Sequence, residues 1–145
     1  MPAGYNREEI GSATTMNKKT LFTLPIASTT FEGGGAFLCR GAILFEYFRD
    51  GSLRKSGIQF ENISALRERA EPSCTAWHVE GSYDTLVEIE ESPWLAEIIS
   101  DIPEVLRPKW GLRHYMIYID SSGCFEFIAK SWKALEEESG SWMPL

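Results

Sequence analysis

The feature that most constrains the fold of this chain is the apolar run over residues 36–53, which closes with the dipeptide Asp50-Gly51. In the strand-like part of this run only Arg40 and Glu46 carry charge, so a strand here is largely apolar on both faces and must be at least partly covered on both. Asp50-Gly51 offers positive φ at two successive positions, as a two-residue type I′ turn requires. The pattern predicts one β-hairpin over residues 36–60.

The register that this turn imposes agrees with the side chains. A two-residue loop pairs Arg49 with Ser52, Phe48 with Leu53, Glu46 with Lys55 and Ile43 with Ile58. Apolar residues then face apolar ones, and the acidic residue faces a basic one. A slip of one residue would turn every side chain to the wrong face, so we expect this register and no other.

Length and charge limit the kind of protein that the chain encodes. It has 145 residues, a length at which one domain with a single core is expected. The formal net charge is -7, with 14 Lys and Arg against 21 Asp and Glu. Sequence-independent nucleic-acid binding depends on clustered positive charge, and no apolar run approaches the length of a membrane span. We therefore expect neither a nucleic-acid nor a membrane partner.

The cysteines and the first apolar stretch suggest the compartment. Cys39, Cys74 and Cys124 form neither a close pair nor a CxxC motif, so no disulfide framework is predicted. Cys39 and Cys124 fall in predicted strands, where we expect buried thiols that suit a reducing compartment. The apolar stretch after Met16 is short, interrupted, and too far from the first residue for a signal peptide. We expect a cytoplasmic protein.

The first residues predict a tail. Residues 1–20 are polar without apolar periodicity, which predicts disorder, and the globular domain is expected to span residues 21–145. Translation could start at Met1 or at Met16, and we expect residues 1–15 to be dispensable for stability.

Residues 21–26 predict a short edge strand, because Pro25 removes a hydrogen-bond donor from the ladder.

Residues 62–71 fit either a helix or a strand. Helix propensity, the N-cap residue Asn62 and the following Pro72 favour a short helix. Ten residues are marginal for a helix without packing, however, and a strand would place Arg67, Arg69 and Glu71 on one face. This choice stays open, whereas the alternation over residues 83–90 predicts a strand with one solvated face.

Residues 92–102 predict the main helix of the fold. Ser92 supplies a capping hydroxyl, and Pro93 suits the first helical position. Apolar residues then follow at helical spacing and form one stripe, made of Trp94, Leu95, Ile98, Ile99 and Ile102.

Residues 113–130 predict a second hairpin. A three-residue loop, Ser121 to Gly123, pairs Ile119 with Phe125 and Ile117 with Phe127 if Gly123 is left-handed. The opposite face then holds His114, Met116, Tyr118, Glu126 and Ile128. A short helix over residues 132–138 is expected to follow. The predicted fold class is α+β: an antiparallel sheet built on two β-hairpins, with the helix of residues 93–102 packed on one face.

Two candidate reactive sets are weak because of their spacing. Cys74, His78, His114 and Cys124 are zinc-ligand types, but they lack the short paired spacings of structural zinc sites. Cys74 with His78 or His114 as base and Asp84 as orienter has the residue types of a nucleophilic site, yet no nucleophile motif flanks Cys74. We expect no metal and no cofactor, and we assign no catalytic residue.

Polar residues on the predicted sheet form a further candidate set. Arg40, Glu46, His114, Tyr118 and Glu126 either pair across neighbouring strands or line a ligand pocket. Arg40 is expected among apolar strand neighbours, where a guanidinium needs an acceptor. Trp77-His78 and Tyr83-Asp84 either line a binding edge or anchor a long connection to the core. The candidate ligand-binding residues are Arg40, His78, Asp84, His114, Tyr118 and Glu126.

No stretch of the sequence carries a specific catalytic signature. The expected function is therefore a non-catalytic binding or protein-interaction domain, which contacts a protein partner or self-associates. The alternative is a small-molecule-binding or hydrolase-like enzyme domain that uses His78, Asp84, His114 and Glu126. A deep pocket where two of these residues meet would favour the alternative, and a flat apolar patch with tryptophan would favour partner binding.

Overall fold

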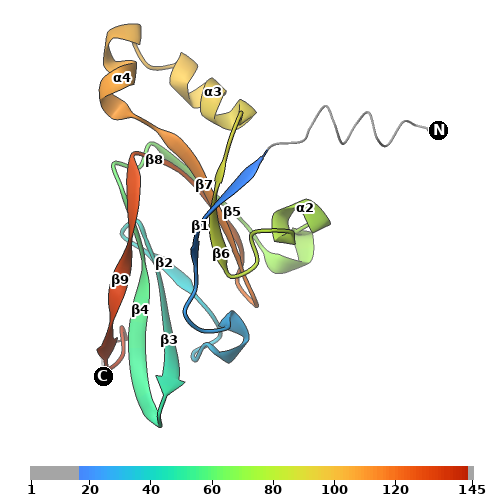
Figure 1. The fold of residues 1–145 in the computed structure, drawn as a ribbon, viewed down its shortest axis with the longest axis vertical. Helices are drawn as coiled ribbons and strands as arrows, with labels where there is room; N and C mark the ends of the chain where they lie inside the picture. The colour runs from blue at the N-terminus through green and yellow to red at the C-terminus, as the bar shows by residue number, and fades with distance from the viewer. Residues whose placement is uncertain (1–16, 144–145) are drawn as a thin grey trace, which may run out of the picture.

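The computed structural model describes residues 17–143, which form two antiparallel β-sheets packed face to face (Figure 1). One sheet has five strands in the order β1-β6-β7-β8-β5, and the other has four in the order β2-β3-β4-β9. The strands are β1 (Lys18–Thr23), β2 (Phe37–Cys39), β3 (Ala42–Arg49), β4 (Ser52–Glu61), β5 (Ala65–Arg69), β6 (Thr85–Ile89), β7 (Arg113–Ile119), β8 (Gly123–Ala129) and β9 (Ser131–Ser139).

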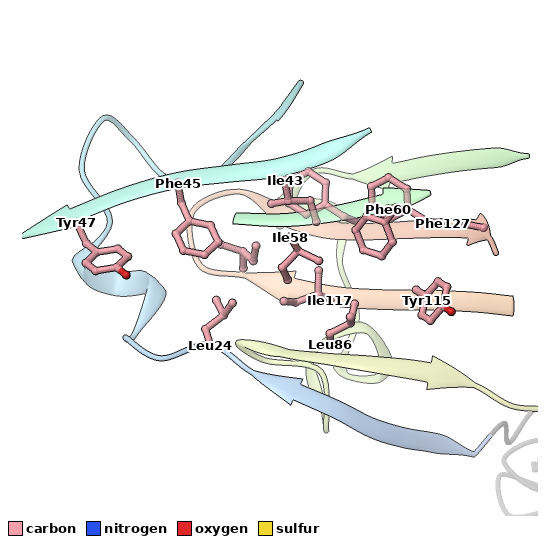
Figure 2. Packing of buried hydrophobic residues seen from close by; sticks show 13 residues of the cluster. Leu24, Ile43, Phe45, Tyr47, Ile58, Phe60, Leu86, Tyr115, Ile117 and Phe127 are labelled. Carbon is pink, nitrogen blue, oxygen red and sulfur yellow. The ribbon is translucent and has the colours of Figure 1, made fainter. Parts of the chain in front are cut away.

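The main core lies between the two sheets, with side chains from both inner faces in contact (Figure 2). Phe60 of β4 stacks on Phe127 of β8 with ring centroids 3.9 Å apart. Ile43, Ile58 and Ile117 are fully buried around this contact. Burial of each such side chain stabilises the fold by roughly 1.5–3 kcal/mol, so packing between sheets holds the sandwich together.

The predicted α+β fold with one main helix on a sheet face is wrong, because the protein is mainly β and its helices are small. The helices are α2 (Ala76–Val79), α3 (Pro93–Ser100) and α4 (Arg107–Trp110), with 3-10 turns at Ser28–Thr30, Glu71–Ser73 and Glu104–Leu106. Ser92 caps α3 as predicted, since its Oγ accepts the Leu95 N–H at 3.0 Å. No residue of α3 is buried, however, and α3 and α4 lie together at one end of the sandwich (Figure 1). A second sheet covers the core in place of the expected helix.

The β3–β4 hairpin has the predicted register, including the pairs Glu46↔Lys55 and Ile43↔Ile58. The apolar run is nevertheless two strands, because Arg40 and Gly41 have φ of 50° and 79° and form another two-residue turn between β2 and β3. Arg40 is therefore exposed at a turn, and its predicted place inside a strand is wrong. Cys39 lies in a strand as predicted, at the end of β2, but it is exposed rather than buried. The cause is an Arg-Gly turn that resembles the Asp50-Gly51 turn in conformation but has no Asn or Asp at its first position.

Two segments with helix propensity are strands. Within residues 62–71, Ala65–Arg69 form β5 and pair with β8. Ser131–Ser139 form β9, so the predicted helix over residues 132–138 is wrong. β9 pairs with the open edge of β4, and a ladder of this length outweighs the modest helix propensity of the sequence.

The second hairpin has the predicted faces but a different register. Ile119 pairs with Gly123 and Ile117 pairs with Phe125, so the ladder is shifted by two residues from the expected pairing. The loop is Asp120 to Ser122, with Ser121 at φ 63°. Side chains alternate with period two along a strand, so a shift of two keeps each side chain on its face.

The N-terminal edge strand starts earlier than expected. β1 runs from Lys18 to Thr23, so it begins inside the segment predicted as a tail and ends before Pro25 rather than at residue 26. It is an edge strand, as predicted. Residues 1–16 lie outside the described residues. The predictions that translation can start at Met16 and that residues 1–15 are dispensable for stability concern this segment, so they stay predictions. No helix within residues 17–143 is both long enough and apolar enough to span a bilayer.

Candidate functional site

A buried hydrogen-bonded pair lies on the outer face of the five-stranded sheet. His114 of β7 and Glu126 of β8 are diagonal neighbours on this face, and the distance from His114 Nε2 to Glu126 Oε1 is 2.7 Å. Both residues are almost fully buried, at 1% and 4% exposure. The hairpin thus brings together two of the six predicted ligand-binding residues, as alternation along the strands requires.

Arg67 of the edge strand β5 completes the charge balance of this pair. Its Nε donates to Glu126 Oε2 at 3.0 Å, and its Nη2 donates to Oε1 at 3.1 Å, a bidentate arrangement. Burial raises the pKa of Glu126, but the hydrogen bonds from His114 and Arg67 outweigh this effect and lower the pKa to about 2. Glu126 is therefore ionised at neutral pH and anchors both partners.

The start of α3 covers this network from outside. Ser92 Oγ lies 2.7 Å from His114 Nδ1, and the Trp94 ring meets the His114 imidazole edge-on with centroids 5.0 Å apart. The Arg67 guanidinium lies 4.0 Å above the centre of the Trp94 ring. These side chains border an open groove of about 370 Å³, here called the Trp94 groove. It is lined by Arg67, Ser92, Pro93, Trp94, Glu97 and His114.

The hydrogen bonds of the network place a different partner at each nitrogen of His114. Glu126 is ionised and can only accept, so His114 Nε2 carries the hydrogen of the 2.7 Å contact to Oε1. At the other nitrogen, Ser92 Oγ accepts the Leu95 N–H and lies 2.7 Å from His114 Nδ1, to which its hydroxyl can donate when the imidazole is neutral. Serine, imidazole and carboxylate thus stand in the order of a nucleophile, its base and an orienting group. The same bonds also attach α3 to the sheet.

The other four predicted residues lie elsewhere. His78 is a capping residue, because its Nδ1 accepts the Thr75 N–H at 2.9 Å at the start of α2. Tyr118 donates to Glu71 Oε2 at 3.0 Å, and burial together with this bond raises its pKa to about 12. Their positions suit the anchoring of the connection over residues 71–83 to the sheet.

Asp84 and Arg40 also lie apart from the Trp94 groove. Asp84 Oδ2 accepts the Ser28 N–H at 3.0 Å, while its buried Oδ1 has no hydrogen-bond partner within residues 17–143. Arg40 is at the exposed β2–β3 turn. The predicted cluster of His78, Asp84, His114 and Glu126 is therefore split between separate contacts.

The structure does not assemble the zinc or cysteine sets. In the part of the chain that is described, no group of three His, Cys, Asp or Glu residues is placed to hold a metal ion. Cys124 is buried in β8, and burial raises the pKa of its thiol to about 12. The Cys74 thiol faces the backbone oxygens of Arg69 and Ala70 at 3.5 Å rather than a histidine. Burial also raises the pKa of Cys74, which disfavours the thiolate that a nucleophile needs.

The sequence does not mark three residues of the Trp94 groove as members of a site. Its pattern places Ser92 and Trp94 only at a helix start, and Arg67 in a segment that fits either a helix or a strand. The strand interpretation of residues 62–71 contains the useful signal, because it places Arg67 on one face with Arg69 and Glu71. The side chain that this face meets is Glu126, the partner of Arg67 in the β5–β8 register.

Comparison of the chain with protein-family models, with curated proteins and with solved structures gives no match.

Proposed function

We propose that this protein is a non-catalytic binding domain that contacts a protein partner through the Trp94 groove. The observation that carries the proposal is the stacking of the Arg67 guanidinium on the Trp94 ring. Two hydrogen bonds from Arg67 to the buried Glu126 carboxylate fix the guanidinium in this position. Tryptophan and arginine are the residues most enriched among energetically dominant interface contacts. A stack that is fixed before binding loses little side-chain entropy when a partner arrives.

The exposed part of the stack indicates the chemistry of the partner. The Arg67 side chain is 51% exposed, and its Nη1 group has no hydrogen-bond partner among residues 17–143. Nη1 is thus free to donate to a carboxylate or a carbonyl oxygen. The half-buried Trp94 and the exposed Pro93 offer apolar surface beside it. These features favour a segment that carries an acidic residue next to an apolar one.

Trp94→Ala should weaken the binding of such segments by about tenfold or more, because it removes both the apolar surface and the support of Arg67. An array of short acidic peptides with neighbouring aromatic residues, probed with labelled protein, selects ligands for wild type. The dissociation constant of the best peptide is then measured for wild type and variant. Self-association, which the sequence also leaves open, is measured on the same samples by sedimentation equilibrium.

Trp110→Ala is the matched control for this experiment. Trp110 is also a partly exposed tryptophan, at 41%, but it belongs to α4 and lies outside the Trp94 groove. Its loss should leave peptide binding unchanged. The proposal fails if no peptide binds wild type, or if Trp94→Ala and Trp110→Ala bind equally well.

A second candidate function, acyl transfer, is favoured by the Ser92–His114–Glu126 relay. In this hypothesis Ser92 Oγ attacks the acyl carbon of an ester, its proton moves to His114 Nδ1, and Glu126 stabilises the imidazolium that forms. The bond from the acyl carbon to the alcohol oxygen then breaks, the alcohol leaves with the proton from His114 Nδ1, and water hydrolyses the acyl-serine by the reverse proton transfers. Two observations place it second: Ser92 is only 5% exposed, and its oxygen already accepts the Leu95 N–H.

A fluorophosphonate probe distinguishes the two functions. If Ser92 is a nucleophile, the probe should add to it, and Ser92→Asn should abolish labelling. Asparagine caps helices about as well as serine, so the helix start is kept while the nucleophile is removed. We expect no labelling of wild type, and adduct formation at Ser92 detected by mass spectrometry would contradict the non-catalytic proposal.

A further inference from the structure

A second cavity lies on the opposite side of the sandwich, at the outer face of the four-stranded sheet. It has a volume of about 440 Å³ and is lined by Glu32, Gly33, Gly35, Phe37, Glu46 and Met143. Glu46 is on the outer face because its strand neighbours Phe45 and Tyr47 belong to the core. The cavity therefore shares no residue with the Trp94 groove.

Glu46 is a buried carboxylate held by neutral donors. It is only 9% exposed, and its Oε2 accepts the Ser141 hydroxyl at 2.5 Å and the Trp142 N–H at 2.6 Å. Trp142 is itself fixed to the sheet, because its Nε1 donates to the Ser56 carbonyl at 2.9 Å. The C-terminal segment thus fixes Glu46 beside the cavity without neutralising its charge.

No cation of residues 17–143 forms an ion pair with Glu46. Lys55 is its partner across the strands, but the Lys55 ammonium lies 3.9 Å from Glu138 and 4.8 Å from the centre of the Trp142 ring. Buried carboxylates in proteins are generally paired with a positive group. The free side of Glu46, toward the cavity, is where such a group fits.

The other walls are fixed and largely free of polar side chains. The Glu32 N–H donates to the Glu46 carbonyl at 2.8 Å, and the Ala36 N–H donates to Ser122 Oγ at 2.8 Å. These two bonds hold both ends of the glycine segment 33–35. Gly33 has a φ of +72°, and a Cβ on it would meet no atom within 4 Å. Phe37 and Met143 add an aromatic ring and a thioether.

We propose that this cavity binds an organic cation, an alkylammonium or guanidinium group, with Glu46 as its charge partner. Glu32 lies at the exposed rim, where it attracts the same charge. Phe37 suits the alkyl part and the face-on approach of the cation, and the Met143 thioether adapts to its shape. A hard metal ion is disfavoured, because such ions require several oxygen ligands and the lining is largely glycine and apolar.

Calorimetry and thermal shift with butylammonium and agmatine test the site, at constant ionic strength. Both cations should raise the melting temperature of wild type, whereas butanol and butyrate should not. Glu46→Gln keeps an oxygen to accept from Ser141 and Trp142 but loses the charge. We expect its dissociation constant for agmatine to rise by about tenfold or more, since charge-assisted hydrogen bonds are roughly twice as strong as neutral ones.

Glu138→Gln is the matched control, because Glu138 is an exposed acid on the same sheet and contacts Lys55 rather than the cavity. It should leave agmatine binding unchanged. A blocked lysine peptide and its Nε-acetylated form separate the two sources of the cation: tighter binding of the lysine peptide than of butylammonium assigns a protein side chain, and the reverse assigns a free amine. The proposal is overturned if neither cation stabilises wild type, or if Glu46→Gln binds agmatine as wild type does.

Discussion

Gly123→Val should destabilise the protein by about 4 kcal/mol or more, which is at the upper end for a single substitution. Gly123 has a φ of +110°, a conformation that a β-branched residue adopts only with strain of roughly 1–3 kcal/mol. A Cβ there would also lie 2.2 Å from the backbone oxygen of Arg69, so β5 and the turn after it would have to move. Urea denaturation followed by circular dichroism measures the loss.

Gly51→Val is the control that separates the effect of backbone strain from the effect of a steric clash. Gly51 has a φ of +76°, but a Cβ at this position would meet no atom within 4 Å. Only the backbone strain applies, so the expected loss is about 1–3 kcal/mol. Equal losses for the two variants would show that β5 does not approach Gly123 as closely as described.

Glu126→Leu should cost about 3–5 kcal/mol of unfolding free energy, the usual result of breaking a buried ion pair from one side. The substitution leaves the His114 Nε2–H without its acceptor in a site that is 1% exposed, and it releases Arg67 from Trp94. Glu126→Gln keeps an acceptor oxygen and should lose less. If Glu126→Leu is as stable as wild type, the network contributes nothing to attaching α3 and β5.

Lowering the pH should remove the stabilisation that the ionised Glu126 carboxylate contributes to the fold. The pKa of Glu126 is lowered from an ordinary 4.5 to about 2 in the folded protein, so its stabilisation is complete above pH 4.5 and is lost as the pH falls through 2. The shift corresponds to about 3 kcal/mol. Glu126→Gln has no carboxyl to titrate there, so the difference in unfolding free energy between wild type and this variant should shrink between pH 4.5 and 2. A constant difference would contradict the assigned ion pair.

Turn residues and the alternation of apolar side chains predicted most of the strands correctly. Prediction failed where a segment's structure depends on which other strand it pairs with. Asp50-Gly51 fixes both a turn and a register in the sequence itself, and the β3–β4 ladder follows it pair by pair. Arg40-Gly41 makes the same kind of turn, but an arginine at positive φ has no strong sequence signal. Residues 131–139 form a strand because they pair with the edge of β4. The residues in and around β9 give no sign of this pairing, because β4 is far away in the sequence.

The candidate site was also predictable only in part: the sequence indicates which residues share a sheet face but not which distant segments contact them. Alternation along the second hairpin placed His114 and Glu126 on one face, even though the predicted register was two residues off. Arg67 and Ser92 join them from segments far away in the chain, through β5–β8 pairing and through the helix start. A sequence pattern shows which face a residue occupies, whereas these contacts depend on which elements become neighbours.

The pairing of β4 with β9 also bears on how quickly the chain can fold. Ser131 bonds Glu61 over a separation of 70 residues, and Ser139 bonds Arg54 over 85. Contacts between such distant residues close long loops, whose entropy is lost before the ladder compensates for it. Domains dominated by non-local strand pairs fold in milliseconds to seconds rather than microseconds. While β9 is unpaired, the edge of β4 has free backbone groups, so in that interval the chain is open to pairing with another copy of itself.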